Sequence, residues 1–143
     1  MPPFIQVRSL SHIYVLEGGP PVAALDHVDL DMDRGEFVAL VGANGSGKST
    51  LAQHLNALLL PTSGEVLVDG LSTRDRGSHW EIRRRVGMVF QSPDNQIVAS
   101  TVEEDIAFGP ENWGLPQEQI RQRVDEALHV VGLEEYGHTP PEM

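Results

Sequence analysis

Alternating hydrophobic and polar positions predict two strands near the amino terminus. Residues 5–7 and 28–33 each place an apolar side chain at every second position, and aspartates fill the gaps in the second segment. A period of two directs one face of a strand toward a core and the other toward water. The run Glu17-Gly18-Gly19-Pro20-Pro21 between them has the composition of a turn or loop. We therefore expect two half-buried strands separated by a loop.

Three further strands are predicted by apolar runs that lie next to turn signals. Phe37–Val41 is apolar throughout and follows a turn at Arg34-Gly35, a pattern typical of a strand buried on both faces. Glu65–Asp69 is closed by a glycine and forms a second candidate. Val86–Phe90 is the third. Together with the helices below, these runs predict an α/β fold.

Three segments have the composition of helices. Ser49–Leu60 is predicted to be helical up to the proline that follows it. Thr101, with Glu104 three residues later, forms a capping box that predicts the start of another helix. A longer helix is predicted with Pro116 in its first turn and Gly132 at its end. Its apolar positions have helical spacing, and we expect that stripe to pack into a core rather than to form a groove for a partner.

Charge narrows the classes of function. The 143 residues include 21 acidic and 10 basic side chains, a net charge of −11. Non-specific binding to nucleic acid needs clustered Lys and Arg, so we expect no nucleic-acid partner. The basic run Arg83-Arg84-Arg85 is interpreted as a solvated helix face. The six histidines lack the close spacing of a helical metal site, and we expect them at the surface or satisfied in the core.

Other absences in the sequence bear on location. Cysteine does not occur, which excludes disulfides and thiolate metal sites. No apolar run approaches the roughly 20 residues that a membrane-spanning helix needs. The first residues, Met-Pro-Pro-Phe, have neither the basic nor the apolar region of an export signal. These features predict a cytosolic protein.

A glycine-rich segment carries the most specific chemistry. Gly42–Ser49 matches G-x-x-x-x-G-K-[ST] at every fixed position. Glycines let the backbone wrap closely round an anion and point N–H groups inward, and a helix start adds positive potential. Lys48 supplies a full charge to the β- and γ-phosphates, and the Ser49 hydroxyl is a hard ligand suited to Mg²⁺. The sequence predicts a nucleotide site, the phosphate cradle, whose binding residues are Gly42, Asn44, Gly45, Ser46, Gly47, Lys48, Ser49 and Thr50.

The cradle alone does not distinguish kinases, GTPases, motor-type ATPases and transport ATPases. No Asn-Lys-x-Asp segment for guanine recognition occurs in the 143 residues. With Tyr14 before the cradle and Gln91 directly after the apolar run Val86–Phe90, the sequence resembles the ATP-binding-cassette (ABC) family. The resemblance implies that ATP and Mg²⁺ are the cofactors and that Tyr14 stacks on adenine. It also implies that Lys48 and Gln91 are catalytic and that Gln91, with Ser49, binds the metal.

The segment from Gln91 to Gly109 is more particular. Its Pro-Asp-Asn-Gln run and Ala-Phe-Gly ending resemble the ATPase subunits of energy-coupling factor importers, which take up vitamins, cobalt or nickel. That resemblance implies an ATP hydrolase coupled to import, at the cytoplasmic, inner face of the cell membrane. The implied partners are a second ABC ATPase, identical or merely similar, and a transmembrane subunit that contacts the Gln91–Thr101 region.

Two alternatives stay open at the level of the sequence. One is a cassette ATPase of a different transporter or of a soluble process such as translation or DNA repair. The other is a small-molecule kinase that uses the same cradle and transfers phosphate to a metabolite.

The resemblance also implies a division of the chain. Residues 1–143 correspond to the amino-terminal part of one ABC ATP-binding domain. Residues 1–91 would form a P-loop core with an antiparallel β subdomain, and residues 92–143 the Q-loop that follows Gln91 and the start of a helical subdomain. The Pro140-Pro141 pair resembles a segment that precedes Leu-Ser-Gly-Gly-Gln in relatives, so we expect a truncation just before that motif.

Hydrolysis of ATP needs groups that this sequence does not supply. It contains no Leu-Ser-Gly-Gly-Gln segment, no apolar strand ending in Asp-Glu and no switch histidine that can be placed. Asp69 ends the run Val66-Leu67-Val68, but glycine follows it and we expect a structural role. The chain is therefore expected to bind nucleotide without hydrolysing it. The resemblance further implies that strands absent from this sequence lie between Phe37–Val41 and Val86–Phe90, which would leave exposed edges that favour aggregation.

Overall fold

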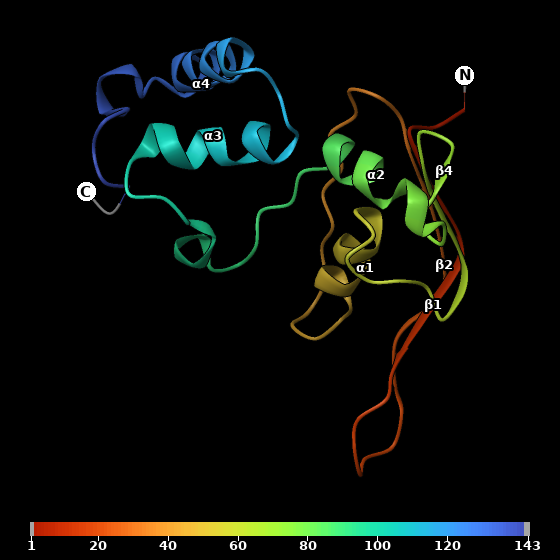
Figure 1. The fold of residues 1–143 in the computed structure, drawn as a ribbon. Coiled ribbons are helices and arrows are strands. Elements are labelled where there is room, and N and C mark those ends of the chain that lie inside the picture. Colours follow the sequence, from red (N-terminus) through yellow and green to blue (C-terminus); the bar gives the residue numbers. More distant parts are fainter. Residues whose placement is uncertain (1, 142–143) are drawn as a thin grey trace. The chain divides into compact units, whose positions relative to one another are not determined.

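The computed structural model describes residues 2–141, in two compact units, Met1–Met88 and Val89–Met143. The first unit carries a sheet with two helices and a short 3₁₀ helix, and the second consists of helices and loops (Figure 1). The boundary falls within the apolar run Val86–Phe90. Each unit is described by itself below.

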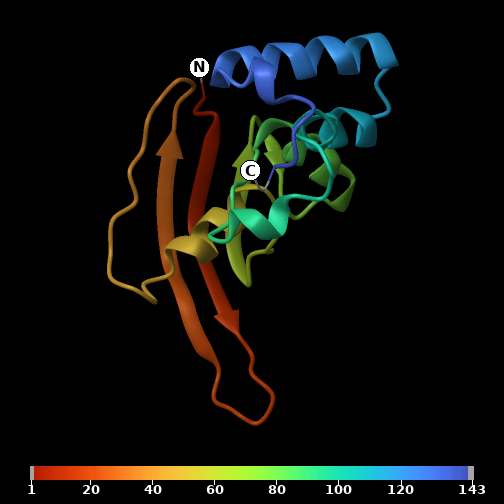
Figure 2. The same cartoon turned by 90° about the vertical axis from the view of Figure 1, so that its left-hand side faces the viewer.

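A four-stranded antiparallel sheet organises the first unit. Its strand order is β2-β1-β3-β4, so β1 lies in the interior with a partner on each side. Figure 2 shows β1 and β2 as a long antiparallel ribbon whose connecting loop contains the predicted Gly-Gly-Pro-Pro turn. The strands are β1 (Ile5–Tyr14), β2 (Val22–Met32), β3 (Ser63–Val68) and β4 (Leu71–Ser72). Strands are confirmed at the predicted residues 5–7, 28–32 and 65–68, but all three are longer than predicted, since β1 continues to Tyr14, β2 begins at Val22 and β3 begins at Ser63.

The β1–β2 pairing is irregular, which shifts the register along the ribbon. Ile5 pairs with Met32 at one end and Tyr14 with Val22 at the other, with register shifts between Val7 and Ile13. A bulge of this kind leaves residues out of the ladder and re-aims the side chains that follow it. The part of β1 that lies beyond the bulge is therefore free to present His12 and Tyr14 differently from a regular strand.

One hydrophobic core joins the sheet to the helices of the first unit. The β1, β3 and α2 side chains at its centre are fully buried, and α1 contributes a further buried leucine. The helices are α1 (Lys48–Leu55) and α2 (His79–Arg85), the latter preceded by the 3₁₀ helix η1 (Arg76–Ser78). The core residues are Ile5, Val7, Leu10, Leu25, Leu51, Ala57, Val66, Val68 and Ile82.

The basic run of α2 behaves as a solvated helix face. Arg85 pairs with Glu81 at 3.0 Å and with Asp69 at 3.1 Å, and Arg84 lies 3.6 Å from Glu81. Arg83 donates to the carbonyl of Ala57. All three arginines are exposed, as the sequence predicted.

Two predicted strands are wrong. Phe37–Val41 and Val86–Phe90 form no ladder, and Phe37 and Val41 are 94% and 90% exposed. An apolar run becomes a strand buried on both faces only where neighbouring strands accept its backbone hydrogen bonds. Within residues 2–141 no strand pairs with either run, so the composition typical of a buried strand appears here without the structure.

Two predicted helix boundaries also differ. The first helix ends at Leu55 rather than Leu60, because the chain leaves the helix at Asn56 and Ala57 has a φ of 58°. The Asn56 side chain accepts the N–H of Leu58, a local bond that competes with helix continuation. Pro116 precedes the long helix as its N-cap instead of lying in its first turn.

The second unit is built on two helices that follow each other in the sequence and pack together, α3 (Val102–Asn112) and α4 (Gln117–Val131). It also contains the 3₁₀ helices η2 (Pro93–Gln96) and η3 (Glu134–Tyr136). Thr101 caps α3 by accepting the N–H of Glu104, and Gly132 ends α4 in the left-handed conformation with φ 69°. The buried α4 positions Val124 and Leu128 belong to the predicted apolar stripe. In the described part of the chain no helix is long and apolar enough to cross a membrane.

Candidate functional site

The phosphate cradle forms a loop that leads directly into α1. Gly45 and Gly47 have φ values of 80° and 92°, and Gly47 is the N-cap of the helix. A turn closes the loop, with the N–H of Ser46 donating to the Ala43 carbonyl at 3.2 Å. The first N–H groups of any α-helix have no acceptor within the helix. At α1 these are the N–H groups that begin at Lys48, and they lie where the motif requires an anion.

Gly47 lies against the backbone of β2. A Cβ at this position would come within 2.5 Å of the Ala24 carbonyl oxygen and 3.0 Å of Leu25 Cδ2. Its positive φ also disfavours a side chain. The N–H of Leu51 donates to the Gly47 carbonyl at 2.8 Å, which ties the same residue to the first turn of α1. Gly47 therefore fixes the loop between a strand and a helix.

The Lys48 ammonium lies over the loop that precedes it. Its Nζ donates to the carbonyls of Gly42 at 2.9 Å and Ala43 at 2.7 Å, and lies 3.4 Å from Ser46 Oγ. Gly42 permits the approach of that hydroxyl, since a Cβ there would lie 2.7 Å from it. A cation held by neutral carbonyls can exchange them for a charged acceptor at a gain, because charge-assisted hydrogen bonds are stronger. These donors fit a phosphate chain.

Tyr14 reaches the same helix start from the end of β1. Its hydroxyl lies 3.2 Å from Thr50 Oγ1, and the residue is 36% exposed. The remaining predicted binding residues, Asn44 and Ser49, are exposed in the loop and in the first turn of α1. The structure therefore brings together Tyr14 and every predicted residue of the cradle.

Gln91 belongs to the second unit, whereas the cradle belongs to the first. It is exposed, in a loop stabilised by side-chain to backbone bonds. The N–H of Phe90 donates to Gln96 Oε1 at 3.1 Å, and Asp105 Oδ1 accepts the N–H of Val98 at 2.8 Å. The metal-binding role predicted for Gln91, together with Ser49, stays a prediction.

Two histidines that the sequence left without a role lie beside Tyr14. The His12 ring packs edge-on against Tyr14 and against His54, with centroids 4.6 and 4.7 Å apart. His54 is fully buried, and its Nδ1 lies 2.7 Å from the Thr50 carbonyl. Burial lowers the pKa of His54, and the charge of a protonated His12 would lower it further. The sequence did not indicate the pair because its members are 42 residues apart. The available signal was the spacing of each histidine from a site residue: His12 is two residues before Tyr14 on a strand, and His54 is four residues after Thr50 on a helix.

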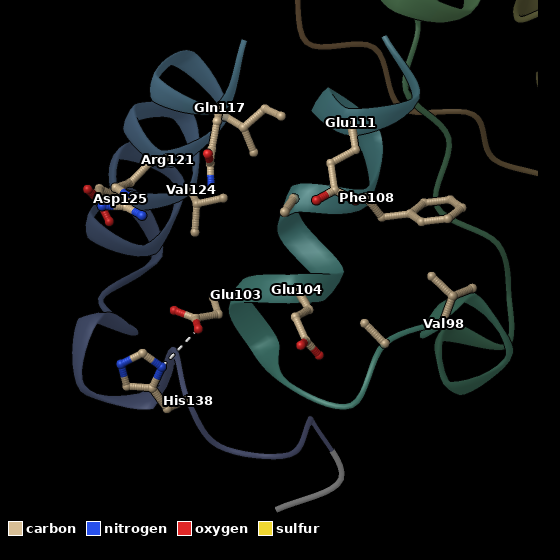
Figure 3. A pocket seen from close by; sticks show the side chains of 13 residues that line it. Val98, Glu103, Glu104, Phe108, Glu111, Gln117, Arg121, Val124, Asp125 and His138 are labelled. Atoms are coloured by element: carbon tan, nitrogen blue, oxygen red, sulfur yellow. Dashed lines mark hydrogen bonds and ion pairs between the residues drawn. The ribbon is translucent and has the colours of Figure 1, made fainter. Parts of the chain in front are cut away.

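A cavity of about 810 Å³ opens in the second unit between α3 and α4. Figure 3 shows Glu103 directed toward His138, and the two side chains are 2.9 Å apart. Its lining includes the acidic side chains of Glu103, Glu104, Glu111 and Asp125 against a single arginine, Arg121. Carboxylates repel a triphosphate, so this cavity is no rival to the cradle as an anion site.

The fold and the cradle agree with the comparison of this chain with known proteins. The ABC transporter family model matches residues 25–143, and the chain belongs to that family. It is 61% identical over 145 residues to the energy-coupling factor transporter ATP-binding protein EcfA1 of Symbiobacterium thermophilum, a match that covers 99% of this chain and 50% of that protein. It is 63% identical over 119 residues to the cobalt import ATP-binding protein CbiO of Syntrophus aciditrophicus, covering 83% of this chain and 42% of that protein.

Solved structures show the same fold. CbiO1 from Clostridium perfringens, part of the ABC transporter complex cbiONQ, aligns with a TM-score of 0.82 at 38% identity, over 98% of this chain and 55% of that one. The cassette MJ0796, in a dimeric post-hydrolysis state with ADP and Pi, aligns with a TM-score of 0.79 at 30% identity, over 96% and 62%. The predicted family and fold class are confirmed. The chain spans about half the length of the curated relatives that it matches.

Proposed function

We propose that the chain is part of the ATP-hydrolysing subunit that energises an importer of the energy-coupling factor type. The observation that carries this proposal is the cradle at the start of α1, where Lys48 and the turn Ala43–Gly47 present donors to an anion. The 61% identity to EcfA1 supports the importer type. The transported class that we propose is a vitamin or a metal ion, and the match to the cobalt import protein CbiO supports the metal ion.

Each residue of the site would hold a different part of the nucleotide. The helix-start N–H groups and the Lys48 ammonium would bind the phosphates, with Lys48 on the β- and γ-groups. Ser49, and Gln91 from the second unit, would hold Mg²⁺, which neutralises phosphate charge when bound. Tyr14 would stack on the base, and Thr50 would hold the Tyr14 hydroxyl as it does in the structure.

The partners follow from the same proposal. A second ABC ATPase, identical or similar, would pair with this subunit, in line with the dimeric MJ0796 cassette. A transmembrane subunit would contact the Gln91–Thr101 region at the inner face of the cell membrane. We propose residues 1–91 as the nucleotide-binding part and 92–143 as the part that begins the coupling region.

Lys48 provides the direct test. Lys48→Ala should weaken binding of ATP by roughly 1.5–3 kcal/mol, the range for hydrogen bonds to charged groups. Arg76→Ala is the matched control, because it removes one positive charge from an exposed position of the same unit and should leave the affinity unchanged. Isothermal titration calorimetry measures both, and equal affinities for the wild type and Lys48→Ala would remove the cradle from this role.

The sequence also allows the lysine to be observed by itself. Lys48 is the only lysine among the 143 residues. Reductive methylation with ¹³C-formaldehyde therefore labels one side-chain amine besides the terminal amine. ATP and inorganic triphosphate should both slow the labelling of Lys48 and, after labelling, shift its NMR signal. Labelling that neither ligand affects would contradict the proposal.

A further inference from the structure

Four residues form a closed ring of contacts at the start of α1, which we call the Tyr14 bracket. The Tyr14 hydroxyl lies 3.2 Å from Thr50 Oγ1, and the Thr50 carbonyl lies 2.7 Å from His54 Nδ1. His54 Nε2 lies 3.1 Å from His12 Nδ1. The His12 ring completes the bracket by meeting Tyr14 edge-on, at an interplanar angle of 75°. Strand β1 supplies two members and helix α1 the other two.

The carbonyl oxygens determine where the imidazole protons lie. A carbonyl can only accept, so His54 Nδ1 must donate to Thr50. A neutral imidazole has one N–H, so His54 Nε2 is an acceptor and His12 Nδ1 must donate to it. The Leu60 carbonyl, 3.2 Å from His12 Nδ1, also requires a hydrogen there. With His54 neutral, the bracket therefore carries a hydrogen on Nδ1 of both rings.

The surroundings favour this neutral arrangement. His54 is fully buried, and the groups that face it are the His12 ring from β1 and the carbonyls of Thr50 and Leu60. On β2 the residue paired with His12 is Leu25, which carries no charge. Burial accordingly lowers the pKa of His54. His54 is therefore a satisfied, neutral group next to the proposed nucleotide site.

We propose that His12 and His54 are positioning residues that hold the Tyr14 ring in the plane against which a nucleotide base stacks. The inference rests on the proposed function, since Tyr14 has a base to meet only if the cradle binds a nucleotide. The Tyr14 hydroxyl is held by Thr50 and its ring contacts the His12 ring in a T-shaped arrangement, while part of the residue stays exposed. A ring held before the ligand arrives loses less conformational entropy on stacking. The bracket thus contributes to the part of the affinity that depends on the base.

The ratio of ATP affinity to inorganic triphosphate affinity isolates that part. Triphosphate contacts the cradle and has no base, so the ratio reports what Tyr14 adds. His12→Ala should lower the ratio about two- to tenfold, as expected for loss of one hydrogen bond and its ring contact, with triphosphate affinity unchanged. A merely structural role would weaken both ligands together, because β1 and α1 support the whole cradle.

A double-mutant cycle shows whether His12 acts through Tyr14. Tyr14→Ala alone should lower affinity for ATP and GTP alike, by about five- to a hundredfold, because stacking reads little base identity. Adding His12→Ala to Tyr14→Ala should then change nothing further. Additive losses would overturn the inference. His12→Phe keeps a ring beside Tyr14 but no donor, so its ratio should lie between those of the wild type and His12→Ala.

Proton positions provide a readout that needs no ligand. The ¹⁵N NMR spectrum of the complete chain should show Nδ1–H on both His12 and His54, whereas free imidazole of histidine prefers Nε2–H. In His12→Phe the His54 signal should change, and in the exposed control variant His27→Asn it should not. An Nε2–H tautomer at His54 in the wild type would overturn the bracket.

The results separate this inference from the function on which it rests. A wild-type chain that binds neither ATP nor triphosphate removes the proposed function. If the wild-type chain binds both ligands, but His12→Ala and His12→Phe leave the ratio of ATP to triphosphate affinity unchanged, only the positioning role of the Tyr14 bracket is refuted. Calorimetric titration of the four variants with the two ligands and GTP gives all of these outcomes.

Discussion

The imidazole of His54 occupies an unusual place for an ionisable group. It is fully buried and both of its nitrogens have partners, so the folded protein has no room for a second proton without breaking the bond to His12. Protonation of His54 would require a hydrogen on Nε2, where the donor of His12 already points. The lowered pKa of His54 is the expected consequence of burial, and it links the stability of the first unit to pH.

The stability of the fold should therefore fall as the pH is lowered through about 6.5, the ordinary value for histidine. The unfolded chain binds a proton there that folded His54 excludes, so the unfolded state gains until the lowered pKa of the folded state is passed. The carboxylates with lowered pKa values, Asp75, Glu104 and Glu134, act only at more acidic pH, near about 4. The two windows are separate.

Urea denaturation followed by circular dichroism between about pH 5 and 8 measures this dependence. His54→Leu should flatten the profile in the histidine window. His27→Asn is the matched control, because His27 is exposed beside Asp26, and it should leave the slope as in the wild type. A wild-type stability that is flat across the window would contradict a buried neutral His54.

Single residues also show what the sequence could and could not indicate. The cradle was predictable because its chemistry is local: Gly42, Gly47 and Lys48 act through a loop that a short motif defines. The partnership of His12 with His54 was not, since it depends on how far β1 runs past its bulge before it meets α1. A bulge changes which side chains share a face of the sheet, and no periodic pattern in the sequence indicates where this bulge lies.

At the scale of elements, the contact of the cradle with β2 is the feature most open to test. Gly47→Ala should destabilise the first unit more than Gly45→Ala does. Both glycines have positive φ, which alone costs about 1 kcal/mol. A Cβ at Gly45 meets nothing, whereas one at Gly47 meets the Ala24 carbonyl at 2.5 Å and adds about 1–3 kcal/mol of overpacking.

The difference between the two alanine variants measures the contact, because the backbone strain is common to both. Chemical denaturation measures the stabilities of the two variants, and titration with triphosphate measures the affinity of their cradles for phosphate. We expect Gly47→Ala to lose triphosphate affinity as the loop moves off β2. Equal stabilities and equal affinities of the two variants would show that β2 does not position the loop.

Prediction of strands succeeded where the partner strands lie among the described residues and failed where no partner strand does. The strands β1, β2 and β3 are neighbours in one antiparallel sheet, and their two-residue periods or turn-bounded runs reflect that arrangement. Phe37–Val41 has the composition of a strand covered on both faces. An apolar run forms such a strand only if other parts of the protein cover both faces and neighbouring strands accept its hydrogen bonds. The residues that the structure describes supply neither.

At the scale of the whole molecule, the lack of neighbouring strands in the described residues leaves apolar side chains exposed to water. Phe37 and Val41 in the first unit, and Val89 in the second, lie almost fully in water. Exposed apolar runs with free backbone groups favour association between chains. We therefore expect this chain to associate with other copies through these exposed runs.

A chain of these 143 residues should bind ATP without releasing phosphate at a steady rate. The carboxylate that follows an apolar strand, Asp69, is held by Arg34 at 2.7 Å and by Arg85 at 3.1 Å, which fits the structural role predicted for it. No apolar strand in the sequence ends in Asp-Glu, and Gln91 carries no charge with which to accept a proton from water. A coupled phosphate-release assay, run on a preparation whose ATP binding has been measured, provides the check. Background turnover equal in the wild type and Lys48→Ala is the expected result. Steady turnover that Lys48→Ala abolishes would show that this chain by itself completes a hydrolytic site.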